Sequence, residues 1–187
     1  MSDRTTGLVH GAEDAGICRK ATGSTTTGPA MTGPAMTGAA VAGIAAGTVI
    51  LTLDGALPVD FIEAGDRIIT REGMRVVRTV TVHRYSGPAI RIAAGALGHE
   101  RPEQDLVLPA GTPVLIRDWR AEALFGARQV VVPVERLADG ESVAPVAALS
   151  LRLYDLRFDT AQVIYAEGLE IACAAPGAAE EARLAAE

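Results

Sequence analysis

The structural pattern of the chain is clearest in Gly47-Thr48-Val49-Ile50-Leu51-Thr52-Leu53-Asp54-Gly55. Its five central residues, Val49 to Leu53, are apolar or β-branched, which is typical of a buried strand. The pair Asp54-Gly55 ends this run and favours a tight turn. We therefore expect short strands that are separated by sharp turns.

The combination of a sharp turn and a short apolar strand recurs toward the C-terminus. The turn Gly65-Asp66 precedes a strand at Arg67-Ile68-Ile69-Thr70, and the turn Glu72-Gly73 precedes a strand at 74–85. Further strands are predicted at 89–92, 105–108, 114–116, 129–132, 149–158 and 162–166. One short helix is predicted at Trp119–Phe125. Short strands with turn signals between them predict an all-β domain.

The composition is that of a globular protein, with 187 residues, 49% hydrophobic and 21% charged. This length is enough for one domain with a sizeable core, and full-length disorder is excluded by the composition. Aromatic residues make up only 4%. The core must therefore be built from Val, Ile, Leu and Ala.

The charge and the cysteines exclude several functions. The net charge is -6, with sixteen arginines, a single lysine (Lys20) and no asparagine. An acidic chain without a basic stripe is a poor ligand for nucleic acid. Cys18 and Cys173 lie far apart, which favours two reduced thiols in a cytoplasmic protein and leaves a single disulfide open. The histidines are scattered (His10, His83, His99), so no metal or cofactor is predicted.

No targeting or membrane segment is predicted. The chain begins Met1-Ser2-Asp3-Arg4, which does not resemble a signal peptide. The longest apolar run, residues 39–53, is shorter than the about 20 residues that span a bilayer. We expect a cytoplasmic protein, and a peripheral place on a membrane complex stays open.

The first 43 residues differ from the rest in composition. Thr, Gly, Ala and Pro dominate there, and a five-residue unit repeats at 27–31 and 32–36. Repeated Gly-Pro steps interrupt helices and strand pairing, so residues 1–43 are predicted to be an extended arm. The arm is interpreted either as a tether or as a segment that docks on a partner. Residues 44–177 form the predicted β domain, and 178–187 a small helix or frayed tail.

Common catalytic motifs are absent or incomplete. The glycines at 43–48 precede a strand and lack a lysine, unlike a phosphate loop or a dinucleotide fingerprint. His83 and His99 are interpreted as surface residues. Thr48 and Cys173 are conceivable nucleophiles without an identifiable base, and Cys173 is better interpreted as a small apolar filler.

The ordered blocks resemble a bacterial Hint domain, the fold of hedgehog and intein autoprocessing proteins. The resemblance begins with Gly47 to Gly55, Leu57-Pro58-Val59 and Gly65 to Thr70. It continues through 90–98, 105–109, 123–127, 158–159 and 166–169, and spans about residues 43–177. It implies a compact Hint-type β fold.

The same resemblance marks the catalytic positions as lost. Active relatives have a cysteine or serine four residues before the Gly-Thr pair, where this chain has Gly43. In their Ser/Thr-x-x-His block this chain has Pro109 at the hydroxyl position and Thr112 at the imidazole position. Where relatives have a histidine just after Phe-Asp, this chain has Thr160-Ala161. Intein-type release would also need a C-terminal asparagine that cyclises, and the chain contains no asparagine.

Nucleophilic catalysis requires a nucleophile and a group that moves its proton. Both are missing at their expected places, and Pro109 also removes a backbone donor for an oxyanion. The sequence therefore predicts a Hint fold without catalytic residues, cofactor or metal.

Three hypotheses for function follow. The first is a non-catalytic interaction or accessory subunit that binds a protein partner through the N-terminal arm. Trp119 could belong to that interface, but a core anchor is the favoured interpretation. The second is residual self-processing near Gly43 through Thr48, Cys173 or water. The third is small-molecule binding in a vestigial cleft between Gly43 and Thr112.

Overall fold

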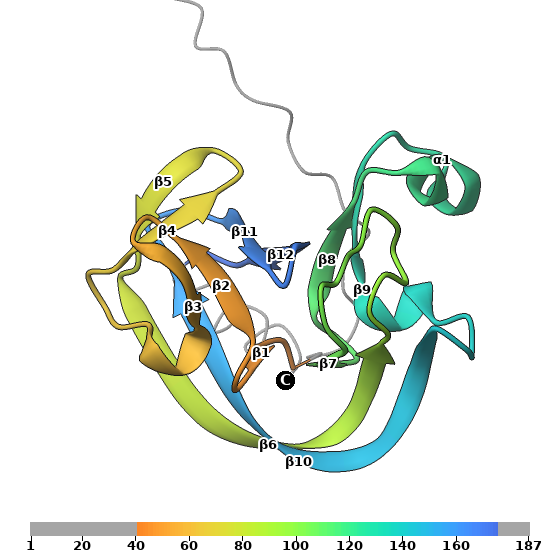
Figure 1. Cartoon of the computed structure of the whole chain (residues 1–187), viewed down its shortest axis with the longest axis horizontal. Coiled ribbons are helices and arrows are strands. Elements are labelled where there is room, and N and C mark those ends of the chain that lie inside the picture. The colour runs from red at the N-terminus through yellow and green to blue at the C-terminus, as the bar shows by residue number, and fades with distance from the viewer. Residues whose placement is uncertain (1–40, 176–187) are drawn as a thin grey trace, which may run out of the picture. The chain divides into compact units, whose positions relative to one another are not determined.

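The computed structural model describes residues 41–175, which form two antiparallel sheets and one short helix (Figure 1). The prediction of an all-β domain is confirmed. The predicted tail at 178–187 and all but the last three residues of the predicted arm at 1–43 lie outside the described residues. Within 41–175 no helix is long and apolar enough to cross a membrane.

The first sheet is built on two long strands, β6 (Thr79–Ile92) and β10 (Val143–Arg157). They pair from Val143 opposite Ile92 to Arg157 opposite Thr79. Figure 1 shows both strands curving along the lower part of the view. The short strands β1 (Ile44–Ala45) and β7 (Leu106–Pro109) pair with β10 and β6, respectively. β1 and β7 lie at opposite edges of the pairing order, but they also contact each other.

The second sheet has the strand order β3-β2-β4-β11-β12-β8-β9, with β5 beside β4. Adjacent hairpins supply most of its pairs. Its strands are β2 (Val49–Thr52), β3 (Gly55–Pro58), β4 (Arg67–Thr70), β5 (Gly73–Val76), β8 (Pro113–Ile116), β9 (Val130–Pro133), β11 (Gln162–Ala166) and β12 (Leu169–Cys173). The turns η1 (Val59–Phe61) and η2 (Val134–Leu137) follow β3 and β9.

The core consists mainly of isoleucine, leucine and valine, as the composition predicts. Ile50, Ile68 and Ile164 are fully buried and belong to three strands of the second sheet. Leu108 of β7 and Phe158 belong to the same cluster. The alternation of buried and exposed residues along β2 fits a strand with one face on this core.

The helix α1 (Trp119–Phe125) occupies the predicted residues. The side chain of Asp118 accepts a hydrogen bond from the backbone amide of Arg120 and caps its start. Gly126 ends it in the left-handed conformation that glycine readily adopts, with φ of 68°. Both ends are thus fixed by local chemistry.

Two strands differ from their predicted bounds. The segment predicted as 74–85 is interrupted between β5 and β6, and β6 then runs on to Ile92. It passes through Gly87-Pro88 because β10 shifts register between Val146 and Leu149 at this point. Proline is tolerated there, since an interrupted ladder needs no donor from Pro88. β10 begins at Val143, earlier than the predicted residue 149, because its pairing with β6 continues on the other side of this register shift.

Candidate functional site

The fold brings Gly43 and Thr112 together, although they are far apart in sequence. Gly43 directly precedes β1, and Thr112 lies in the turn between β7 and β8. The Thr112 hydroxyl donates a hydrogen bond of 3.3 Å to the carbonyl oxygen of Gly43. Thr112 is fully buried. The two positions that the resemblance marks as catalytic are therefore neighbours in this fold.

The space beside Gly43 is occupied by Leu153 of β10. A Cβ atom built on Gly43 would lie 3.1 Å from Leu153 Cβ and 3.3 Å from its Cδ1. Leu153 is itself fully buried, so it has little freedom to move away. A side chain at position 43 would therefore require a small shift of Leu153 in the core.

The turn after β7 has most of its backbone donors in use. Pro109 has no N–H, and the amide of Thr112 donates to the carbonyl of Pro109 at 2.9 Å. The amide of Ala110 donates to the carbonyl of Pro88 at 3.0 Å. An oxyanion hole needs free, converging donors. Neither of these two amides is free.

The Phe158–Asp159 block serves the fold. Phe158 is buried in the core. Asp159 accepts two hydrogen bonds from Arg78, at 2.7 and 2.8 Å, and these hold the pKa of the Asp159 carboxyl below its usual range. At the position of the missing histidine, the hydroxyl of Thr160 accepts a hydrogen bond from Gln162. The block therefore anchors the start of β11.

The other candidate nucleophiles are buried. Burial, followed by the charge of Asp155, raises the pKa of the Cys173 thiol to about 12. Since the thiolate is the reactive form, Cys173 is inert near neutral pH and fits its interpretation as an apolar filler. Thr48 is 4% exposed.

The two described histidines lie in different places. His83 lies opposite Leu153 in the β6–β10 ladder, and His99 is exposed on the loop between β6 and β7.

Asp60 fixes the chain after β1, a role that the sequence did not reveal. Its carboxylate accepts hydrogen bonds from the amide of Gly47 at 2.5 Å and from the hydroxyl of Tyr154 at 3.1 Å. These contacts join η1, the turn before β2, and β10. The segment around Gly43 is thereby held from both ends.

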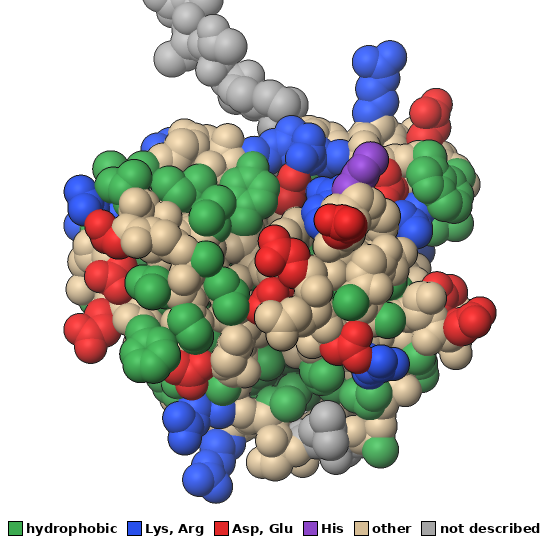
Figure 2. Space-filling model, viewed as in Figure 1, with side chains coloured by type: hydrophobic (Ala, Val, Ile, Leu, Met, Phe, Trp, Pro, Cys, Tyr) green, Lys and Arg blue, Asp and Glu red, His purple; other side chains and the backbone are tan. Residues whose placement is uncertain are grey.

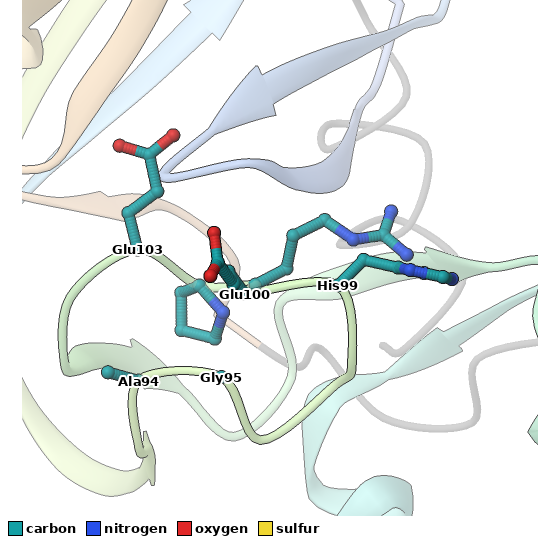
Figure 3. A pocket seen from close by; sticks show the side chains of 7 residues that line it. Ala94, Gly95, His99, Glu100 and Glu103 are labelled. Carbon is teal, nitrogen blue, oxygen red and sulfur yellow. The ribbon is translucent and has the colours of Figure 1, made fainter.

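Two cavities lie away from Gly43, around the loop 93–105. The larger, of about 560 Å³, is lined by this loop and includes His99, Glu100, Arg101 and Glu103 (Figure 3). The smaller, of about 200 Å³, shares His99 and Arg101. Neither cavity is lined by Gly43 or Thr112. The hypothesis of a ligand cleft between those two residues stays a prediction.

A buried carboxylate lies at the wall of the smaller cavity. Glu170 of β12 accepts two hydrogen bonds from Arg117, one of them from Nε at 2.9 Å. Arg71 NH1 contacts the same carboxylate at 3.3 Å. This pairing raises the pKa of the Arg117 guanidinium. Because this cluster joins three segments that are distant in sequence, no local sequence pattern predicted it.

Trp119 does not anchor the core, so the favoured interpretation was wrong. Its side chain is 70% exposed, and the guanidinium of Arg120 lies 5.1 Å from the ring centroid. The reason is that α1 buries only Ala121, which leaves Trp119 on the outer side of the helix. Leu124 on the same helix is 59% exposed.

Arg120 also ties α1 to the loop 93–105. Its two terminal nitrogens donate to the carbonyl oxygens of Leu97 at 3.3 Å and of Ala96 at 3.0 Å. It forms an ion pair of 2.8 Å with Asp118 as well. The helix that carries Trp119 and the loop that carries His99 are therefore joined by one side chain.

Residues 41–175 contain no group of three or more His, Cys, Asp or Glu side chains placed to hold a metal ion.

Comparison with known proteins identifies the family. The model of the Hint domain family matches residues 42–178. Among solved structures, the bacterial intein-like domain from Clostridium thermocellum is similar at a TM-score of 0.52 and 17% identity, over 72% of this chain and 99% of that one. The MchDnaB-1 and gp41-1 inteins give TM-scores of 0.45, at 15% and 9% identity, over 71% and 70% of this chain and 99% and 98% of theirs. No curated protein matches. The chain belongs to the Hint domain family.

Proposed function

We propose that this chain is a Hint domain that no longer processes itself and instead serves as an accessory subunit that binds a protein partner. The single observation that carries the loss of chemistry is the packing of Leu153 against Gly43. Position 43 lacks a nucleophile, and a side chain there would meet Leu153 at a distance shorter than ordinary van der Waals contact. Restoring a cysteine alone would therefore not restore the site.

The remaining hydroxyl does not replace the missing chemistry. Thr112 donates to the carbonyl of Gly43 itself, which belongs to the peptide bond after Gly43. A self-cleaving Hint domain attacks the peptide bond before its first residue. A threonine hydroxyl also does not exchange protons near neutral pH, as a histidine does. This contact supports a structural role for Thr112.

The partner-binding part of the proposal is supported by the surface of α1. Trp119 and Leu124 expose large apolar side chains on one short helix, and Arg120 stacks on the tryptophan ring. Tryptophan and arginine are enriched among residues that carry the binding energy of protein interfaces. The predicted contribution of the arm stays a prediction, as do the cytoplasmic location and the absence of nucleic-acid partners.

Intact mass of the full-length chain tests the loss of processing. We expect the 19.3 kDa species to persist during overnight incubation at neutral pH, with and without a thiol. Conversion into two fragments that meet near Gly43 would contradict the proposal. That outcome would favour residual self-processing.

Binding of a partner is tested by purifying the tagged chain from its own cells. We expect a stoichiometric partner that is lost from Trp119→Ala. A matched control is Val82→Ala, since Val82 is also exposed but lies on β6. Equal recovery of the partner with both variants would remove Trp119 from the interface.

A further inference from the structure

The smaller cavity combines apolar walls with charged groups that are only partly used. It lies between the loop 93–105, the end of β8 and the start of β12. Its apolar walls include Leu97, Leu115, Ile116 and Leu169, and its charged lining includes Arg101, Arg117 and Glu170. Such a lining fits a group with an apolar stem and a charged end.

Arg101 is held in place with its terminal nitrogens unused. Its Nε donates to the carbonyl oxygen of Gly98 at 3.4 Å, and its terminal nitrogens find no acceptor within residues 41–175. Its stem packs over Gly168, where an added Cβ would lie 3.2 Å from the Arg101 Cγ. The guanidinium is therefore positioned at the cavity with free donors.

The charged lining is balanced, with Arg101 and Arg117 against Asp118 and Glu170, although the whole chain has a net charge of -6. Glu170 is bound by both Arg117 and Arg71. Asp118, also at the cavity, is paired with Arg120. Figure 2 shows a histidine with both Lys/Arg and Asp/Glu side chains around it on the face in view. The two carboxylates that line this cavity are thus already paired with arginines, and the terminal nitrogens of Arg101 have no acceptor among residues 41–175.

The nearest unpaired carboxylates point elsewhere. In Figure 3, Glu100 and Glu103 project toward one side of the loop, while His99 points away from both. His99 lines both cavities and so lies where a ligand of the smaller cavity would alter its surroundings. The NMR signal of the His99 ring can therefore report binding in the smaller cavity.

The size of the cavity limits its ligand. Its volume of about 200 Å³ is below the roughly 300–1,000 Å³ of typical small-molecule sites. It has room for one amino-acid side chain. A carboxylate on a short apolar stem would meet Arg101 through charge-assisted hydrogen bonds and place its stem against the apolar walls.

We propose that this cavity receives an acidic side chain of the partner polypeptide, beside the contact made by Trp119. Asp118 lines the cavity and Trp119 is the next residue, so one extended segment can reach both. This inference rests on the proposed function, because it assigns the chemistry of the partner's contacting segment. It identifies Arg101 as the residue that recognises the carboxylate.

The test follows the ring signal of His99 by NMR in the full-length chain. His99→Gln identifies this signal among those of the three histidines. The probe is the blocked peptide acetyl-Ala-Leu-Glu-Leu-Ala-amide, matched with the same peptide carrying glutamine. We expect saturable shifts with the glutamate peptide and at least about tenfold weaker binding of the glutamine peptide. Equal binding of the two peptides would overturn the proposal.

Arg101→Met keeps the stem over Gly168 and removes every donor of the guanidinium. We expect this variant to bind the glutamate peptide about tenfold more weakly. Arg84→Met is the matched control, since Arg84 is exposed on β6 away from the cavity, and it should bind like the unchanged chain. Unchanged binding by a folded Arg101→Met would overturn the proposal, and a thermal melt of each variant verifies folding.

Two further measurements separate the possible failures. If propionate binds as tightly as the peptide, the cavity is a site for small acids, and its assignment to a partner is overturned. Intact mass is recorded on the same samples. An uncleaved chain whose His99 signal ignores the peptide overturns this inference alone, whereas a cleaved chain overturns the proposed function.

Discussion

Two polar regions of this chain use their hydrogen-bonding groups in opposite ways. Around Gly43 the polar groups bind each other, and a leucine fills the remaining space. Around Arg101 a cavity remains open, and donors of a positioned guanidinium have no acceptor in the described residues. The position that the family resemblance marks as catalytic is thus the more tightly packed of the two. The cavity with the free donors of Arg101 lies outside the positions that the family resemblance marks as catalytic.

The closed region depends most strongly on Leu153. Leu153→Ala should lower the free energy of unfolding by about 3 kcal/mol, because a fully buried side chain leaves a cavity. Urea denaturation measures this loss. Leu151→Ala, in the same strand but half-buried, should cost clearly less. Equal losses would mean that position 153 is not tightly packed.

Gly43→Cys should destabilise the chain by about 1–3 kcal/mol, because its Cβ meets Leu153. Leu153→Ala removes the Cδ1 contact at 3.3 Å but keeps the Cβ contact at 3.1 Å, so the same substitution should cost only somewhat less in that background, and a double-mutant cycle measures this coupling. Ala46→Cys, at an exposed position, should change stability by less than about 0.5 kcal/mol. Additive effects at 43 and 153 would argue against the filled-site explanation.

Glu170→Gln probes the other region, at the wall of its cavity. The variant keeps the shape of the side chain but leaves Arg117 and Arg71 without a charged partner. We expect a loss of about 1–2 kcal/mol, less than for a fully buried pair, because both arginines are partly exposed. The exposed Glu63→Gln serves as control. A neutral Glu170→Gln would show that the cluster does not organise this wall.

Thr112→Val removes the hydroxyl that binds Gly43 while keeping the shape. The buried carbonyl of Gly43 then loses this donor, and we expect a loss of about 1 kcal/mol. Thermal melts of both variants measure this loss. Thr79→Val, at an exposed position of β6, should be nearly neutral in the same experiment. A stabilising Thr112→Val would indicate that the hydroxyl is a remnant without a structural role.

The smallest expected effect concerns Asp159 and the dependence of stability on pH. The hydrogen bonds from Arg78 lower the pKa of folded Asp159, so its contribution is present above the unfolded pKa of about 3.9. It is lost as pH falls through the folded value. Asp159→Asn should therefore lose less stability than the unchanged chain between pH 5 and about 2. Parallel pH profiles would exclude a contribution from this exposed pair.

Local features of the sequence predicted much of the fold, and contacts between distant segments account for the rest. Asp118 and Gly126 fixed the ends of α1, and hairpin turns fixed most short strands. The length of β6 depends on a bulge in β10, which has no signature near Pro88. The resemblance paired Gly43 with Thr112, and the structure brings these two residues into contact. The sequence did not predict that Leu153 fills this site, because that contact joins residues more than a hundred positions apart.

The bridge that Arg120 forms between α1 and the loop 93–105 has a consequence for avidity. It holds the exposed Trp119 at a fixed spacing from the cavity that contains Arg101. A partner engaged at the tryptophan then meets the cavity at a high effective concentration, so two weak contacts combine into a stronger one without any new interaction. Loss of the Arg120 bridge would let this spacing vary and so weaken the mutual reinforcement, in addition to removing the guanidinium from the Trp119 ring.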